Sequence, residues 1–366
     1  MGVKVKESLQ VSPYLLWFLV HGSQTGVGML SFQRKVAGGA GQDAWVSLLL
    51  VGLLFHLLLW MMFKLLSYSE GGDILSLHRE YFGKWAAVMI AGWFYVYGLL
   101  VVAVQIKSYG EIIQVWIFPD QPLWVITALI LLVCAYIVSG GFRTVTGISF
   151  FGVIIPSFLV LSLYFPLKYA HWNNFLPMLN HDTGDYLLSA RHTLYIYLGA
   201  EFILLYLPFI KNPKQAQKWA HLGIAHTTFI YLIVLVVTFA YFNLQLLQHT
   251  VWPTLILSKI IRLFFLYRFD YVYVFTWFIV IVPTCCIILW SIVHAMKQIS
   301  GRPARLWLWI SVLIVGVIVQ LERSPVSLQK LEAVTAAAGS LFILCYLPLL
   351  FVWISIIRAY KRRLTK

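Results

Sequence analysis

Residues 11–37 read VSPYLLWFLVHGSQTGVGMLSFQRKVA and combine the features of a membrane helix with those of a turn. Val11–Phe32 carries no Asp, Glu, Lys or Arg and exceeds the roughly 20 residues that cross a bilayer. Its centre, residues 22–28, holds three glycines and one Ser, Gln and Thr. Glycine frees the backbone to leave the helix, and a broken helix at membrane depth exposes peptide groups that lipid cannot satisfy. The segment therefore predicts a span that is broken where it lines a binding cavity.

The whole chain has the composition of a helical membrane protein. Of its 366 residues, 61% are hydrophobic and only 11% are charged, which excludes a soluble globular protein. The four cysteines fall within apolar runs and form neither a disulfide framework nor a metal-binding spacing. The sequence contains no phosphate-binding loop, catalytic triad or paired carboxylates. It therefore predicts no enzyme, no cofactor and no metal.

Charge-free runs divide the chain into ten predicted spans within a single membrane domain, residues 1–366. A polar connection at residues 168–185 separates a first five-helix repeat, residues 11–167, from a second, residues 186–357. A further apolar segment, Trp252–Phe265, is predicted to lie over the site on the outer side. The predicted spans are residues 11–32, 44–63, 85–106, 121–142, 144–167, 186–210, 219–243, 271–296, 306–321 and 333–357.

Both halves begin with a glycine-interrupted helix. In the second half the break falls at Gly199-Ala200-Glu201, and Pro208 closes the span. An odd number of spans in each half gives the two copies opposite topologies, which is the pattern of an inverted-repeat transporter. The predicted fold is therefore an all-α integral membrane protein with ten transmembrane helices in a 5+5 inverted repeat and broken first and sixth helices.

The distribution of charge predicts the orientation in the membrane. With the N-terminus inside, 17 of the 27 Lys and Arg residues fall on the inner side and 10 on the outer side. The acidic residues show the opposite bias, with 4 inside and 8 outside. This pattern follows the positive-inside rule and suits anionic lipid at the cytoplasmic face. The net charge of +14 thus indicates membrane lipid and no nucleic acid, and both termini are predicted to be cytoplasmic.

Broken helices present polar backbone near the middle of the membrane. Amides at the start of a half-helix suit a carboxylate and freed carbonyls suit an ammonium group, so a zwitterionic amino acid matches both. Thr25, Gly26 and Val27 are the candidate substrate-binding residues at the first break. The alternative is that these glycines only permit close helix packing.

Glu201 is the one carboxylate within a predicted span. Acids inside a membrane are unfavourable and usually functional. Its position just after Gly199 also places it at the start of a half-helix, where it can satisfy loose amides. Two interpretations stay open, a substrate or proton site and a tether for the broken backbone.

A polar stripe follows the third predicted span. Tyr97, Val101, Gln105 and Ser108 are spaced by four, four and three residues, so they share one helical face. We expect this face to line the interior of the bundle, with Tyr97 as a hydrogen-bonding candidate and Val101 shaping an apolar subsite. The alternative for Tyr97 is a hydrogen bond between helices.

Two further candidates come from the second half of the chain. Pro283 removes a backbone donor from the eighth span, and Thr284 follows it directly. Leu198 adjoins the second break and is predicted to contribute to the apolar wall of the site.

Several motifs carry a resemblance to a known family. They are Gly26-Val27-Gly28, Gln42-Asp43-Ala44-Trp45, Gly199-Ala200-Glu201-Phe202, Leu207-Pro208-Phe209 and Arg268-Phe269-Asp270. With these motifs the chain resembles, over essentially its whole length, the spore germination receptor B subunit. These permease-like proteins belong to the amino acid–polyamine–organocation superfamily. The resemblance implies a fold like that of the sodium-coupled leucine transporters.

The same resemblance implies a sensing role in the spore inner membrane, in a complex with a membrane-anchored A subunit and a lipoprotein C subunit. A small nutrient germinant, often an amino acid, binds the permease-like pocket, and the receptor signals the release of ions and dipicolinic acid. The alternatives are a proton- or sodium-coupled amino-acid permease and a channel-forming subunit. The family's ligand positions correspond here to Gly26, Tyr97, Val101, Leu198, Gly199 and Thr284.

Overall fold

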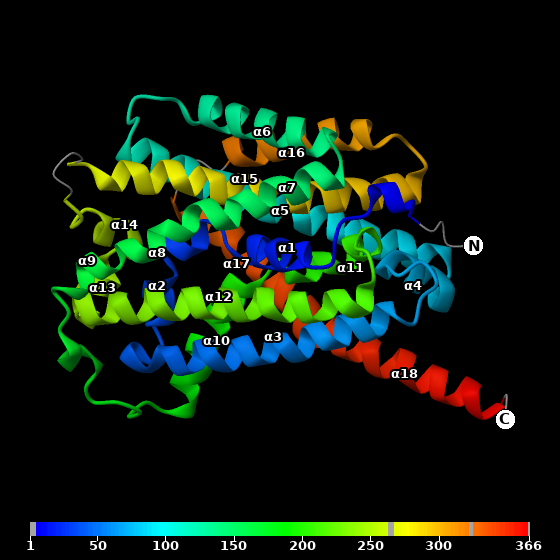
Figure 1. Ribbon diagram of the computed structural model, residues 1–366, viewed down its shortest axis with the longest axis horizontal. Helices are drawn as coiled ribbons and strands as arrows, with labels where there is room; N and C mark the ends of the chain where they lie inside the picture. The colour runs from blue at the N-terminus through cyan, green and yellow to red at the C-terminus, as the bar shows by residue number, and fades with distance from the viewer. Residues whose placement is uncertain (1–4, 263–266, 322–324, 365–366) are drawn as a thin grey trace.

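The structure is a computed structural model that describes residues 5–262, 267–321 and 325–364 (Figure 1). Within these ranges the regular elements are helices, and one isolated bridge joins Val11 to Ile210. The helices are α1 (Leu15–Gln24), α2 (Phe32–Val36), α3 (Ala44–Leu66), α4 (Ile74–Phe82), α5 (Lys84–Trp116), α6 (Leu123–Ser139), α7 (Phe142–Ile154), α8 (Phe158–Ser162), α9 (Tyr164–Leu167), α10 (Thr183–Tyr197), α11 (Ile203–Tyr206), α12 (Pro213–Tyr241), α13 (Leu244–His249), α14 (Pro253–Ser258), α15 (Phe269–Ser300), α16 (Ala304–Leu321), α17 (Pro325–Leu341) and α18 (Leu347–Leu364).

Seven helical segments are long and apolar enough to cross a membrane, which is the architecture of a multi-pass membrane protein. A further pair, Thr183–Tyr197 with Ala200–Phe209, forms an eighth span if its 45° bend is counted within one crossing. The other two predicted spans correspond to the 17-residue helix α6 and to the short helix α1. The seven segments are Gly41–Leu66, Lys84–Trp116, Phe142–Leu167, Pro213–Tyr241, Phe269–Ser300, Ala304–Leu321 and Val326–Lys361.

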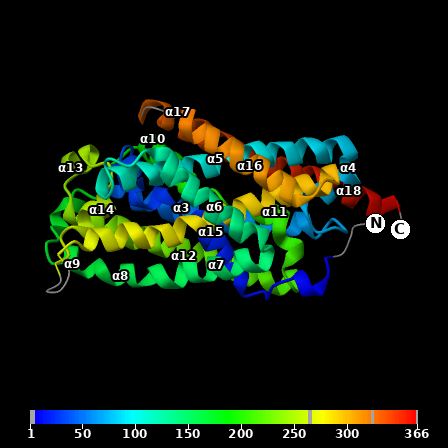
Figure 2. The ribbon, with the colours of Figure 1, turned by 90° about the horizontal axis from the view of Figure 1, so that it is seen from above.

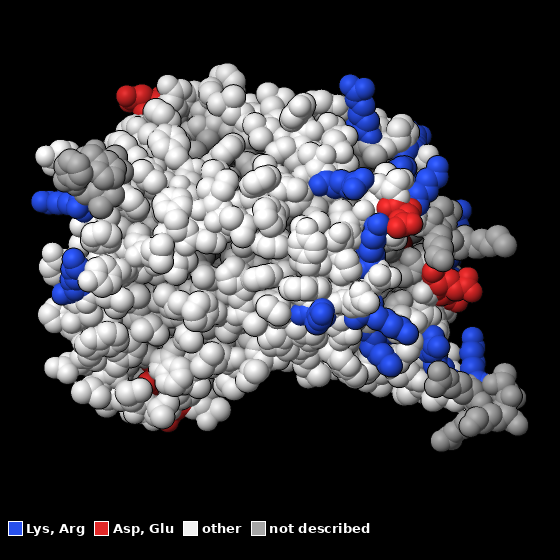
Figure 3. All heavy atoms as spheres, viewed as in Figure 1, with Lys and Arg blue, Asp and Glu red and all other residues white. Residues whose placement is uncertain are grey.

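The long helices run side by side along the longest axis of the molecule, and both chain ends lie at the same end of it (Figures 1 and 2). On the face drawn in Figure 3, charged side chains gather at the two ends and leave the middle uncharged. Lys and Arg concentrate at the end that carries the termini. Large apolar side chains such as Leu53, Leu129 and Leu313 are exposed on the surface. An uncharged apolar surface between two polar ends matches the profile of a bilayer.

The first broken segment lies inside the bundle. Every residue of α1 from Phe18 to Gln24 is buried, and α1 packs against α7, α12 and α15. A helix that is buried on all sides needs no polar face toward solvent, so its polar residues must serve interior contacts. The position of α1 therefore brings residues 22–28 into the interior of the protein.

Helices α5 and α15 extend well beyond the predicted spans at residues 85–106 and 271–296. The charges of α5 are balanced where it continues, because Lys107 Nζ lies 3.5 Å from Glu111 Oε1, one turn further on. Helix α15 continues until Gly301, which takes a φ of +70° and ends it. The extension of α5 carries its polar stripe toward the end of the molecule opposite the chain termini (Figure 1).

Candidate ligand-binding site

The chain leaves the helical conformation after Gln24, in the middle of the predicted first span. Thr25 and Gly26 are extended, and a 3₁₀ turn, Val27–Leu30, then leads toward α2. The carbonyl groups released here find side-chain donors: Tyr231 OH donates to Gln24 O at 3.1 Å, and Trp277 Nε1 donates to Gly26 O at 3.2 Å. Side chains from α12 and α15 therefore replace the missing helical hydrogen bonds.

Thr284 serves the same break from α15. Its hydroxyl lies 2.7 Å from Gly22 O and 2.7 Å from Thr25 O, and 3.0 Å from Val280 O in its own helix. Thr284 is fully buried and does not line the ligand cavity described below. Thr284 therefore supports the end of α1 through these hydrogen bonds.

The second break begins after α10, where Leu198 is extended and Gly199 has a φ of +118°. A 3₁₀ turn, Ala200–Phe202, and α11 follow. The two breaks touch, because a Cβ built on Gly199 would lie 2.1 Å from Ser23 O. Gln24 Nε2 also donates to Tyr197 O at 3.0 Å. The two interrupted segments therefore meet directly in the interior.

Glu201 binds the backbone of its own break and a side chain of α5. Its Oε2 accepts from Gly199 N at 2.8 Å, and its Oε1 accepts from Tyr97 OH at 2.6 Å. The side chain is completely buried. This geometry is that of a tether between the second break and α5, and it occupies the Tyr97 hydroxyl with a hydrogen bond between helices.

A cavity of about 170 Å³ lies between the two breaks, α5 and α17. Of the nine predicted site residues, Gly26, Val27, Tyr97, Val101 and Leu198 line it. The other four do not line it and form hydrogen bonds at the breaks: Thr25, Gly199, Glu201 and Thr284. The lining continues along α5 through Val104, Gln105, Ser108 and Glu111.

The part of the cavity next to α2 and α17 carries charged residues that the sequence did not indicate. Lys35 Nζ on α2 forms an ion pair with Glu332 Oε2 on α17 at 2.6 Å, and Arg34 and Glu111 line the same region. The paired residues are 297 positions apart, so no local pattern relates them. The signal that could have pointed to Arg34 and Lys35 is their position directly after the first break.

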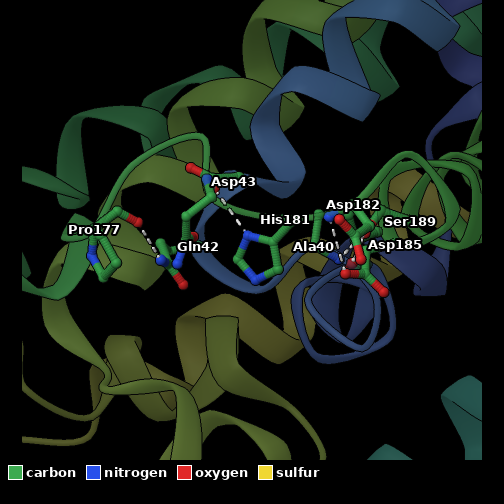
Figure 4. Close-up of polar contacts among 10 residues, drawn as sticks. Ala40, Gln42, Asp43, Pro177, His181, Asp182, Asp185 and Ser189 are labelled. Atoms are coloured by element: carbon green, nitrogen blue, oxygen red, sulfur yellow. Dashed lines mark hydrogen bonds and ion pairs between the residues drawn. The ribbon is translucent and has the colours of Figure 1, made fainter.

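The polar connection at residues 168–185 is fixed to the beginning of α3 (Figure 4). Asp43 Oδ2 accepts from His181 Nδ1 at 2.9 Å, and Gln42 Nε2 donates to Pro177 O at 2.6 Å. Ala40 N donates to Ser189 Oγ at 2.8 Å, which adds a contact to α10. These contacts give the Gln42-Asp43 motif a structural role at the end of the bundle opposite the chain termini.

The predicted outer segment Trp252–Phe265 begins with α14 and lies against the first break. Thr254 Oγ1 donates to Met29 O at 3.1 Å, and Trp252 lines the cavity. Residues 263–265 of this segment lie outside the described residues. Among the residues that the structure describes, no group of three or more His, Cys, Asp or Glu is arranged to hold a metal ion.

Two solved structures share this fold. A Na⁺-coupled sialic acid symporter in a substrate-bound outward-open state matches over 92% of this chain and 79% of its own, with a TM-score of 0.64 and 11% identity. MhsT in complex with L-phenylalanine matches over 93% of this chain and 86% of its own, with a TM-score of 0.61 and 16% identity. The chain therefore has the fold of these transport proteins.

The sequence comparisons identify the family. The profile of the family described as spore germination protein matches residues 10–327. Spore germination protein GerQB of Bacillus cereus is 34% identical over 343 residues, which cover 94% of this chain and 95% of the relative. Spore germination protein B2 of Bacillus subtilis (strain 168) is 24% identical over 71% of each chain. The chain belongs to the spore germination protein family, in agreement with its resemblance to germinant-receptor B subunits.

Proposed function

We propose that this protein is a germinant-receptor B subunit that binds a small amino acid in the cavity between the two breaks and thereby triggers spore germination. The observation that carries the proposal is the meeting of the two broken segments at a cavity whose wall includes bare backbone at Gly26 and apolar side chains at Val101 and Leu198. Such a wall offers polar groups to the ends of an amino acid and an apolar surface to its side chain. Membership of the spore germination family supplies the biological role.

The finer architecture is part of the same proposal. We infer ten membrane helices in a 5+5 inverted repeat, with α1 and α10 as the broken first and sixth helices. Eight of these correspond to the long apolar segments and the bent pair, and α6 and the α1 segment supply the other two. Both termini face the cytoplasm, since the end that carries them is rich in Lys and Arg (Figure 3).

The proposed setting is the spore inner membrane, with anionic lipid at the basic end. The proposed partners are the A and C subunits of the receptor. In this assembly the B subunit recognises the ligand and performs no catalysis. The charge-free middle of the surface suits the bilayer, and the relatives named as spore germination proteins support the placement in the spore.

A second candidate is an amino-acid permease driven by protons or sodium. The observation in its favour is the likeness of the fold to that of a Na⁺-coupled symporter over 92% of this chain. A transporter must open the cavity alternately to both sides of the membrane and release the ligand inside, whereas a receptor needs only a ligand-dependent change of conformation. Uptake therefore distinguishes the two functions.

The test is binding followed by uptake. Each of the common L-amino acids, tritiated, is offered to the purified full-length protein in detergent, and every binder is then offered to proteoliposomes. Saturable binding without uptake supports the receptor. Uptake that requires a proton or sodium gradient supports the permease instead. If no amino acid binds, the proposed ligand class is wrong.

A further inference from the structure

Gln105 projects from α5 into the cavity and lies against the first break. Its Oε1 accepts a hydrogen bond from Val27 N at 2.8 Å. A Cβ built on Gly26 would lie 2.3 Å from Gln105 Nε2 and 2.5 Å from its Oε1, so the amide can approach only because residue 26 has no side chain. The side chain of Gln105 therefore fills the space beside the bare backbone of residues 26–27.

This contact uses a donor that an amino-acid ligand needs. Val27 N–H points to Gln105 Oε1, and both residues line the cavity, so a ligand that displaces this side chain can reach the N–H. A carboxylate accepts hydrogen bonds more strongly than a neutral amide oxygen does. Ligand and Gln105 cannot both take the one N–H in good geometry, since a backbone N–H donates a single hydrogen.

The side chain of Gln105 can also rotate away from Val27 N. It is only half-buried, and its side chain turns about three single bonds without any movement of α5. Its neighbour on the same face, Ser108, lines the same cavity one turn further along α5. A space therefore exists along α5 into which the amide can rotate.

Building on the function proposed above, we propose that Gln105 sets the affinity of the site by occupying, in the ligand-free protein, the position that the ligand carboxylate takes on Val27 N–H. The ligand replaces the side-chain amide when it binds. The measured affinity of the ligand is then reduced by the free energy of the hydrogen bond between Val27 and Gln105 that the ligand displaces. The ligand class is a molecule with a free carboxylate and an apolar body that fits beside Val101 and Leu198.

The test compares the wild type with three variants of the full-length protein. Tritiated L-amino acids are the probes, and Kd is measured in detergent. Gln105→Ala removes the competing amide and is expected to lower Kd about fivefold, the effect of one hydrogen bond. Gln105→Glu places a stronger, charged acceptor on the same N–H and is expected to raise Kd at least as much. Gln114→Ala is the matched control, because Gln114 lies on α5 outside the cavity and donates to Gln121 O at 2.8 Å, and it is expected to leave Kd unchanged.

The outcomes separate this inference from the function on which it rests. A lower Kd for Gln105→Ala and a higher Kd for Gln105→Glu, with equal melting temperatures, support it. An unchanged or higher Kd for Gln105→Ala in a wild type that binds amino acids overturns the inference and leaves the proposed function intact. An equal gain in Gln114→Ala also overturns it, because the loss of a glutamine from α5 away from the cavity would then explain the effect. If neither the wild type nor any variant binds, the proposed function fails and the inference fails with it.

Discussion

Gly199 is the residue whose backbone is most constrained where the two breaks meet. Its φ of +118° disfavours any residue with a side chain, and a Cβ there would lie 2.1 Å from Ser23 O, a backbone atom that cannot rotate away. We predict that Gly199→Ala destabilises the protein by about 2 kcal/mol or more. The melting temperature of the purified variant in detergent measures this loss.

A second glycine provides the control for this prediction. Gly92 lies within α5, and a Cβ built there would contact nothing within 4 Å. Gly92→Ala is expected to keep or raise the melting temperature, because alanine favours a helix by about 1 kcal/mol over glycine. Equal losses in both variants would show that alanine at these positions disturbs the fold for a reason unrelated to the Gly199 contact.

The candidate site residues Val101 and Thr284 lie at different depths in the structure. Val101 lines the cavity, whereas Thr284 is fully buried behind the first break. We predict that Val101→Ala changes the order in which amino acids bind, by up to about tenfold per ligand, since the subsite gains space. Thr284→Ser keeps the hydroxyl and should preserve the order. Competition binding with a panel of amino acids distinguishes these results, and an altered order in Thr284→Ser alone would contradict the assignment.

At the residue scale, the sequence indicated those groups whose chemistry is unusual for a membrane interior. The glycines of the first break and the lone carboxylate Glu201 stand out from an apolar background, and both lie where the segments meet. Lys35 and Glu332 did not stand out, since charged residues near the ends of spans are ordinary. Their pairing depends on how two distant helices pack, which no local pattern contains.

At the scale of elements, Asp73 begins α4 at the end that carries the chain termini. Its Oδ1 accepts from Ser76 N at 2.6 Å, and Gln298 Nε2 on α15 donates to its Oδ2 at 3.2 Å. Asp73 is an N-cap and fixes α4 against the neighbouring helices. Burial raises the pKa of its carboxyl above the ordinary value of 3.8.

The raised pKa of Asp73 predicts a pH dependence of stability. A folded-state pKa above the unfolded one means that folding favours the protonated form, so the contribution of Asp73 is complete below pH 3.8 and is lost as pH rises through the folded pKa. Asp73→Asn keeps a capping oxygen and cannot ionise. The variant should therefore gain melting temperature relative to the wild type as pH rises from 4 to 7. Parallel pH profiles for the two proteins would contradict this prediction.

The positions of the helices were predicted better than their ends. The charge-free runs located the long apolar segments correctly. However, the third predicted span ended at residue 106, because the charged residue Lys107 follows. In the structure α5 continues to Trp116, because Glu111 lies one turn from Lys107 and balances its charge. Conversely α6 ends at Ser139, before the predicted boundary at residue 142, since Gly141 takes a φ of +87°. Helix ends depend on turns and pairs as well as on hydropathy.

At the scale of the whole molecule, the basic end and the proposed topology make a prediction about accessibility. Asn173 in the polar connection at residues 168–185 and Ser300 at the end of α15 are both exposed, and they should face opposite sides of the membrane. In sealed right-side-out vesicles, Asn173→Cys should react with a membrane-impermeant maleimide, and Ser300→Cys should react only after permeabilisation. Cys345 is replaced by Ser in both proteins, since it is the exposed native cysteine among the described residues. Labelling of both positions from outside would refute the topology.

The ion pair between Lys35 and Glu332 also bears on biosynthesis. The two partners are 297 residues apart in the sequence. Nearly the whole chain has therefore been synthesised before Glu332 reaches the membrane. The first break is synthesised early, but the wall contributed by α17, with Glu332 and Thr335, comes last. The nascent chain therefore lacks this wall of the cavity until the last apolar segment, Val326–Lys361, docks. The site is completed at the end of assembly, and a shortened chain that lacks α17 would contain both breaks and no closed cavity.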